Sequence, residues 1–292
     1  MTARDRVFQQ HRPLILSLAY RMLGSWTDAE DAAQEVWLRW RSTQDTIASP
    51  RAYLSTIAAR VCLDLIKSAY RRREKYPGPW LPEPVADPVP DPLERTEQIS
   101  YAFLVLLETL TPAERAVFVL REAFDAGYPE IARLLDLSEA NCRQILKRAR
   151  DRLAAGRARF APDTARCTTL MQAFFQASAE GDTAAIERML HEDAVFTGDG
   201  GGKAPAAMRP VMGPERIAKL MAGLGRLAPA DLRVKWITVN GGAPAMVAWS
   251  GGAVITLGLC EFEGDRIRRV FFIRNPDKLE RFRAIFDASS DS

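Results

Sequence analysis

The chain has 292 residues, of which 47% are hydrophobic and 26% charged, and this predicts about two globular domains of ordinary composition. Its net charge of +3 at pH 7 excludes neither a protein nor a nucleic-acid partner. The kind of partner has to be inferred from how the charges are distributed along the chain. The 4 cysteines form no CxxC pair, only 2 histidines are present, and no run approaches about 18 apolar residues. We therefore expect a reduced, cytoplasmic protein with no membrane span, no metal and no other cofactor.

Residues 1–76 predict helices only. Gly24 can end the first helix, and Thr27 with Glu30 gives a capping-box pattern for the second. Ser49 and Pro50 predict the start of a third, longer helix.

A proline-rich linker is expected over residues 77–97, and helical patterns resume over 98–160. From residue 163 to 292 the pattern changes to two helices, a strand, a glycine loop and several β-rich segments. This last part predicts an α+β domain with one curved antiparallel sheet.

The strongest local pattern is a helix-turn-helix over residues 127–153. Its second helix begins at Ser138, and its inward positions are Ile145, Leu146 and Ala149. The outward positions carry side chains that can pair with bases or hold phosphates, namely Asn141, Arg143, Gln144, Lys147 and Arg148. The alternative is an ordinary helical hairpin with a polar face.

The long third helix becomes basic towards its end. Its cationic side chains are Arg60, Lys67, Arg71, Arg72 and Arg73. With Trp37, Trp40 and Tyr53 expected nearby, this helix suits a melted DNA strand whose bases can stack. The alternative is that the tryptophans, Trp40 above all, belong to the core.

A different face is expected on the second helix, where Asp31, Gln34, Glu35 and Leu38 share one side by helical spacing. An acidic stripe repels DNA, so a partner for it would be a basic protein surface. The alternative is a face that is merely solvated.

Taken in order, these parts resemble a bacterial extracytoplasmic-function sigma factor. "DAEDAAQEVWLRW" resembles the region that clamps the β′ coiled coil of core RNA polymerase, which implies polymerase contacts by Asp31, Gln34, Glu35 and Leu38. The basic helix resembles the regions that read and open the −10 element, and the helix-turn-helix resembles region 4, which reads the −35 element. The resemblance covers about residues 1–158 and implies two all-α domains that bind promoter DNA.

The remaining chain resembles a SnoaL-like domain, and sigma factors with this appendage form a recognised subgroup, the SigJ type. Three strings resemble its markers: "WLPEP" at 80–84, "DGGGK" at 199–203 and "NPDK" at 275–278. We expect Trp80 and Leu81 to dock on the C-terminal domain near the other two strings, so that this domain tunes activity in cis. The interdomain residues would be Trp80, Leu81, Pro82, Asp199, Gly200, Gly201, Gly202, Lys203, Asn275, Pro276, Asp277 and Lys278. The alternative is that Trp80 only covers its own domain.

The C-terminal domain contains no convincing acid–base pair in its sequence, so we expect no enzyme. Asp199 beside Lys203 is more typical of a structural pair than of a general base. A small apolar ligand stays open as an alternative, since a pocket could be lined by Phe174, Phe175, Phe196, Trp236, Trp249, Phe271 and Phe272. Two rival functions also stay open: a DNA-binding regulator independent of polymerase, and a SnoaL-type enzyme or ligand sensor fused to a regulatory head. A separate anti-sigma protein is compatible with the main interpretation but not required by it.

Overall fold

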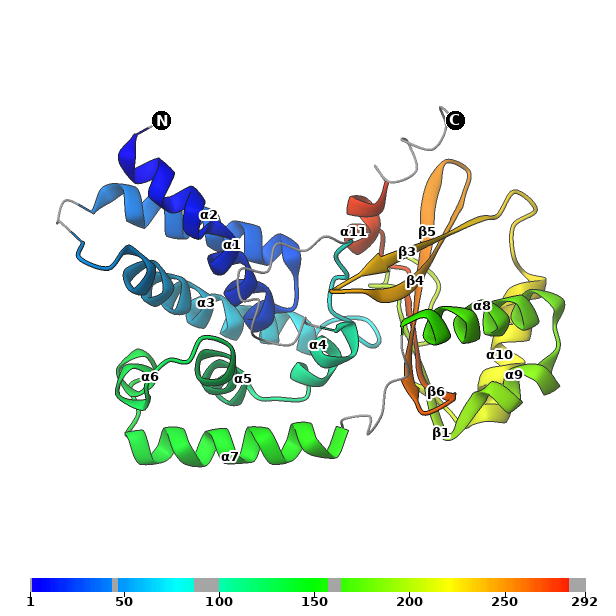
Figure 1. Ribbon diagram of the computed structural model, residues 1–292. Coiled ribbons are helices and arrows are strands. Elements are labelled where there is room, and N and C mark those ends of the chain that lie inside the picture. Colours follow the sequence, from blue (N-terminus) through cyan, green and yellow to red (C-terminus); the bar gives the residue numbers. More distant parts are fainter. Residues whose placement is uncertain (1, 44–46, 87–99, 157–163, 284–292) are drawn as a thin grey trace. The chain divides into compact units, whose positions relative to one another are not determined.

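The computed structural model describes residues 2–43, 47–86, 100–156 and 164–283 (Figure 1). The chain divides into two compact units. The helical unit comprises Met1–Lys75, Pro82–Pro84 and Val89–Arg157, and the sheet unit comprises Tyr76–Leu81, Val85–Pro88 and Ala158–Ser292. In the described ranges, no helix combines the length and the apolar character that crossing a membrane requires.

The helical unit begins with a three-helix bundle of α1 (Ala3–Leu23), α2 (Trp26–Ser42) and α3 (Pro50–Glu74). Gly24 ends α1 in the left-handed conformation at φ 68°, as its position predicts. The capping box expected at Thr27 and Glu30 is wrong, because the Ser25 side chain caps α2 by accepting from Asp28 N at 3.1 Å. Thr27 therefore lies inside the first turn of α2.

The second part of the helical unit comprises α4 (Tyr101–Leu107), α5 (Pro112–Phe118), a π-helix (Val119–Ala123), α6 (Tyr128–Leu135) and α7 (Glu139–Gly156). Thr111 and Glu114 form a reciprocal capping box at the start of α5. Asp136, at φ 55°, makes the left-handed turn between α6 and α7. Helix α3 contacts both α5 and α6, so the two helical segments expected as separate domains pack together in one unit.

The sheet unit contains helices α8 (Thr164–Glu180), α9 (Thr183–Met189), α10 (Pro214–Arg226) and α11 (Pro276–Leu279). Its strands are β1 (Leu190–Asp199), β2 (Val211–Met212), β3 (Arg233–Val239), β4 (Ala243–Ser250), β5 (Ala253–Glu263) and β6 (Arg266–Ile273), in the order β2-β1-β6-β5-β4-β3. Most neighbours are antiparallel as expected, but β1 and β6 pair in parallel. These two strands are not joined by a hairpin, so nothing in the local chain forces them to be antiparallel.

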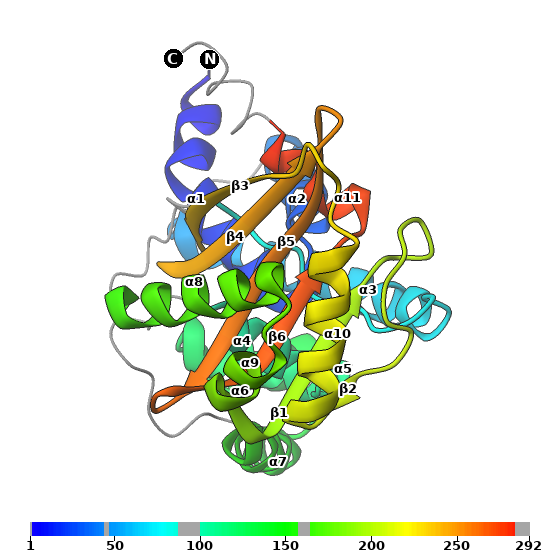
Figure 2. The ribbon, with the colours of Figure 1, turned by 90° about the vertical axis from the view of Figure 1, so that its right-hand side faces the viewer.

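Helices α8, α9 and α10 lie on one face of this sheet, as Figure 2 shows, and the core fills the layer between them. Helix α10 approaches α8 at Gly225, where a Cβ atom would lie 1.9 Å from Ser178 O. The sequence did not predict α10, because two glycines within one turn are unfavourable in a helix. Gly225 allows the close approach of the two helices, whereas Gly223 faces open space.

Candidate nucleic-acid interface

Helix α7 presents the face that its sequence predicts. Ser138 Oγ accepts from Asn141 N at 3.2 Å and so caps the start of the helix. The buried side is formed by Cys142, Ile145, Leu146, Ala149 and Leu153. The exposed side is formed by Arg143, Gln144, Lys147 and Arg148, with Asn141 half-buried at its edge. Side chains of the types that can pair with bases or hold phosphates therefore share one accessible surface of the second helix of the helix-turn-helix.

The basic side chains of α3 divide into two groups. Arg60, Lys67 and Arg71 are exposed and remain available to an anionic partner. Arg72 is exposed but forms an ion pair with Asp28 of α2 at 3.0 Å. Arg73 is turned inward, and its side chain is only 13% exposed. In this conformation the predicted −10 face contains Arg60, Lys67 and Arg71, with Arg72 at its margin.

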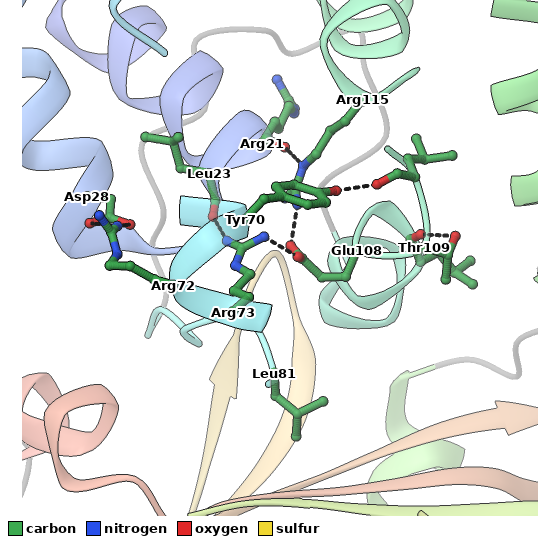
Figure 3. Close-up of polar contacts among 12 residues, drawn as sticks. Arg21, Leu23, Asp28, Tyr70, Arg72, Arg73, Leu81, Glu108, Thr109 and Arg115 are labelled. Carbon is green, nitrogen blue, oxygen red and sulfur yellow. Dashed lines mark hydrogen bonds and ion pairs between the residues drawn. The ribbon is translucent and has the colours of Figure 1, made fainter. Parts of the chain in front are cut away.

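Arg73 takes part in a buried ionic cluster, which Figure 3 shows in close-up. The Glu108 carboxylate, directly after α4, pairs with Arg73 of α3 through one oxygen and with Arg115 of α5 through the other. The Arg115 side chain is 0% exposed, and its Nε donates to Arg21 O at 2.9 Å. Arg73 also donates to Leu23 O. Glu108 therefore joins the end of α3 to α5 inside the helical unit.

Burial lowers the pKa of one arginine in this cluster. Desolvation lowers the pKa of Arg73 to about 10, although the Glu108 carboxylate opposes the change. At neutral pH Arg73 still carries its charge, so the cluster holds two cations on one carboxylate. Sequence reasoning missed Glu108 and Arg115. The only signal was an arginine next to the apolar run "AVFVL", all of which except Phe118 is buried.

Helix α2 presents the acidic face as predicted. Asp31 and Gln34 are exposed, and Glu35 forms an exposed pair with Arg39 at 2.8 Å. Leu38 on the same side is 48% exposed and lies among these polar side chains. Carboxylates around an exposed apolar side chain are typical of a protein-binding surface and unsuitable for DNA.

The aromatic residues near α3 are divided between core and surface. Trp40 is buried, and its Nε1 donates to Arg4 O at 3.0 Å, which makes it the core residue that its stripe suggested. Trp37 is half-buried under the Arg41 guanidinium, which lies 5.4 Å from its ring centre. Trp37 is thus the tryptophan of α2 that a DNA base could still contact.

In the sheet unit, the three marker strings meet at Asp199, whose side chain is fully buried. Its carboxylate accepts from Tyr76 Oη at 2.6 Å, from Leu81 N at 2.9 Å and from Lys278 Nζ at 2.6 Å. Lys278 also donates to Leu81 O and lies 4.0 Å from the centre of the Trp80 ring. Burial and the Asp199 carboxylate raise the pKa of Tyr76 above its usual value. Trp80 and Leu81 are therefore held through a buried Asp199–Lys278 ion pair.

The partner of Asp199 differs from the one its sequence neighbours suggest. Lys203 pairs with Asp277 at 2.6 Å, and both side chains are exposed. Gly201 has φ 60°, and a Cβ there would lie 2.5 Å from Asn275 Nδ2. The glycine run therefore lets the chain pass close to Asn275 and Tyr76. Pro276 begins α11, whose N-cap is Asn275.

The second half of "WLPEP" packs within the helical unit. The buried Glu83 carboxylate accepts from Thr27 N and from Ser25 Oγ, each at 3.1 Å, at the start of α2. Tyr20 Oη donates to Glu83 O at 2.6 Å, and Tyr101 Oη donates to Pro82 O at 3.0 Å. A carboxylate at a helix N-terminus is stabilised by the helix dipole. Glu83 is a structural residue that sequence reasoning did not single out.

The aromatic residues of the sheet unit pack mainly against one another. Phe175 contacts the rings of Phe174, Trp236 and Phe272 at centre distances of 5.5–5.9 Å. Gly258 lies beneath them, since a Cβ there would come within 2.8 Å of Phe175 Cζ. Most of the proposed pocket residues are therefore core, whereas Phe271 is buried outside this cluster and Trp249 is half-buried. Among the described residues, no three His, Cys, Asp or Glu side chains group as metal ligands would.

Comparisons with known proteins match all three parts of the chain. Residues 7–72 match Sigma-70 region 2, residues 100–153 match Sigma-70 region 4, and residues 171–274 match the SnoaL-like domain. The ECF RNA polymerase sigma factor SigJ of Mycobacterium tuberculosis is 37% identical over 287 residues, covering 93% of this chain and 91% of SigJ. Probable ECF RNA polymerase sigma factor SigI of the same species is 29% identical over 290 residues, covering 95% of each chain. The crystal structure of SigJ superposes with a TM-score of 0.72 at 33% identity, covering 94% of this chain and 97% of SigJ.

Proposed function

Because the chain belongs to the extracytoplasmic-function RNA polymerase sigma factors and carries a C-terminal SnoaL-like domain, we propose that it binds core RNA polymerase and directs initiation at specific promoters. The observation that supports this best is the division of charge in the helical unit. Its α2 face is acidic with an exposed leucine, whereas its α3 and α7 faces are basic. The proposed work takes place at the chromosome, so we place the protein in the cytoplasm.

Each face has its own partner in this proposal. Asp31, Gln34, Glu35 and Leu38 contact a basic surface of the polymerase, the β′ coiled coil. Arg60, Lys67 and Arg71 of α3 hold the −10 strand while its bases leave the stack, with binding energy replacing any covalent chemistry. The exposed face of α7 enters the major groove of the −35 element.

Reading both elements requires the helical unit to open. The numbering of the −10 and −35 elements places them about 25 base pairs apart. This separation is about 85 Å along B-DNA. Helices α3 and α7 both contact α5, so their separation beside α5 is at most about two interaxial distances, or roughly 20 Å. The Arg73–Glu108–Arg115 cluster therefore holds a closed form in which Arg73 is withheld from DNA, and its separation would release Arg73 to the −10 face.

We place the SnoaL-like domain in a regulatory role without catalysis. Each unit holds its own part of "WLPEP", since Trp80 and Leu81 pack within the sheet unit and Pro82–Pro84 within the helical unit. A change in the contacts that either unit makes with "WLPEP" would therefore alter the position of the same short segment. The pair Trp80→Ala and Leu81→Ala should change promoter-dependent transcription while core binding persists, and unchanged transcription would count against cis regulation. A separate anti-sigma protein is not required.

The main test is a pull-down with core polymerase followed by run-off transcription with the full chain. Charge reversal by Asp31→Lys with Glu35→Lys should abolish both signals, because like charges would then face each other. The matched control is Glu192→Lys with Asp193→Lys, two exposed acidic residues of the sheet unit, which should leave both signals unchanged. If the Asp31 and Glu35 variant still binds the polymerase, the assigned face is incorrect. Sequence-specific binding to duplex DNA by the chain alone would instead favour a regulator independent of polymerase.

A further inference from the structure

The ring of Tyr128 lies beneath two guanidinium groups of the helical unit. Tyr128 is the first residue of α6, before the turn that leads to the recognition helix α7. The guanidinium carbon of Arg121 lies 5.2 Å from the centre of this ring, and that of Arg143 lies 4.8 Å from it. Both distances fall within the range of cation–π contacts. Tyr128 thus connects the π-helix to the exposed face of α7.

The two arginines differ in how they are held. Arg121 is fixed from its own loop, because its Nη1 donates to Ala126 O at 3.0 Å and to Asp125 Oδ1 at 3.2 Å. Arg143 is held on α7 by Glu139, whose Oε2 accepts from its Nη2 at 2.9 Å. The Arg143 side chain nevertheless stays 55% exposed. It is oriented by a ring and a carboxylate while it remains accessible from outside.

We propose that Tyr128 and Glu139 are positioning residues that orient the Arg143 guanidinium for a bidentate contact with one guanine of the −35 element. The inference rests on the proposed function and adds two residues that its DNA-binding set lacked. A flexible arginine loses conformational entropy when it reads a base, and a side chain already held in place loses less. The planar guanidinium can stack on the ring and present a rigid fork of donors to the guanine edge, a geometry that a lysine ammonium lacks.

The experiment uses holoenzyme reconstituted from core polymerase and the full chain, transcribing a promoter library randomised over the −35 region. Sequencing the transcribed templates gives the preference at every position. We expect the wild type to prefer guanine at one position and Arg143→Ala to lose that preference. Tyr128→Leu should weaken it roughly two- to fivefold, the worth of one exposed cation–π contact, and Tyr128→Phe, which keeps the ring, should retain it.

Glu139→Gln provides a second variant on an exposed side chain that cannot disturb the core. Removal of a negative charge near DNA should raise overall binding, while the preference at the Arg143 position falls. A purely structural role for Tyr128 would lower the preference at all positions together, and that result would overturn the inference. So would a wild-type preference that Tyr128→Leu and Glu139→Gln both leave intact. A wild-type holoenzyme with no preferred −35 base would overturn the proposed function itself.

Discussion

Removing the Glu108 carboxylate should open the contact between α3 and α5 in the helical unit. In the variant Glu108→Ala, Arg73 and Arg115 lose the one acid that pairs with both of them. Arg115 cannot turn to solvent easily, because its side chain is 0% exposed. Breaking a buried ion pair by deleting one partner costs about 3–5 kcal/mol, since the remaining charge stays desolvated. Glu108 is 14% exposed, so we expect the lower end of this range, about 3 kcal/mol.

Hydrogen exchange of the full chain, read by mass spectrometry, measures this opening without assuming that the two units unfold together. A loss of about 3 kcal/mol corresponds to a roughly hundredfold loss of protection in peptides from the end of α3 and from α5. The matched control is Glu122→Ala, because the Glu122–Arg150 pair lies in the same unit with exposed fractions of 35% and 58%. Such a surface pair contributes about 0–1 kcal/mol, which is at most about fivefold in protection.

The outcome also bears on the proposed opening. If Glu108→Ala loses no more protection than Glu122→Ala, the cluster does not hold α3 to α5 and the closed form needs another explanation. If the closed form competes with promoter recognition, holoenzyme that carries the variant should bind promoter DNA at least as tightly as wild-type holoenzyme, because part of the opening cost has been removed. A variant that is simply misfolded would bind more weakly.

Three further predictions concern the sheet unit. Asp199→Asn should lower the hydrogen-exchange protection of residues 76–81 by roughly a hundredfold, because it leaves the buried Lys278 ammonium without its carboxylate. Lys203→Ala should change this protection little, because the pair of Lys203 with Asp277 is exposed. The stabilising effect of Tyr76, measured as the difference in unfolding free energy from Tyr76→Phe, should be constant below pH 10 and shrink above it. The sign follows from the raised folded-state pKa of Tyr76: above about pH 10 the unfolded chain loses this proton and the folded one retains it. Gly201→Ala should destabilise the unit by at least about 1–2 kcal/mol in chemical unfolding, because φ is 60° there and the new Cβ meets Asn275, whereas Gly223→Ala has open space and should be neutral or stabilising.

Periodicity and caps predicted the helices because those signals are local. The inward positions of α7, Ile145, Leu146 and Ala149, follow from a 3.6-residue repeat and are all buried. The start of α2 was misplaced by two residues, since Ser25 and Thr27 are both good caps and the distant Glu83 occupies the backbone N–H of Thr27. The parallel pairing of β1 with β6 was missed for a similar reason, as their register depends on chain segments about 75 residues apart.

The charged residues of the candidate sites were likewise predictable only where their position depends on local sequence. The outward residues of α2 and α7 could be listed from the sequence, because exposure on an amphipathic helix depends only on its own spacing.

A buried charge depends on a partner that the chain brings from elsewhere. Nearby sequence offered Lys203 for Asp199, yet Lys278 takes that place from 79 residues away. Lys203 is four residues from Asp199 but on the far side of a glycine turn, and it reaches Asp277 instead. Arg73 looked like one member of a basic run, and only the folded helical unit sets it apart, because α4 and α5 bring Glu108 and Arg115 against the last turn of α3. Where an ionic side chain is buried, its role follows from the tertiary partner that compensates its desolvation, and local sequence does not specify that partner.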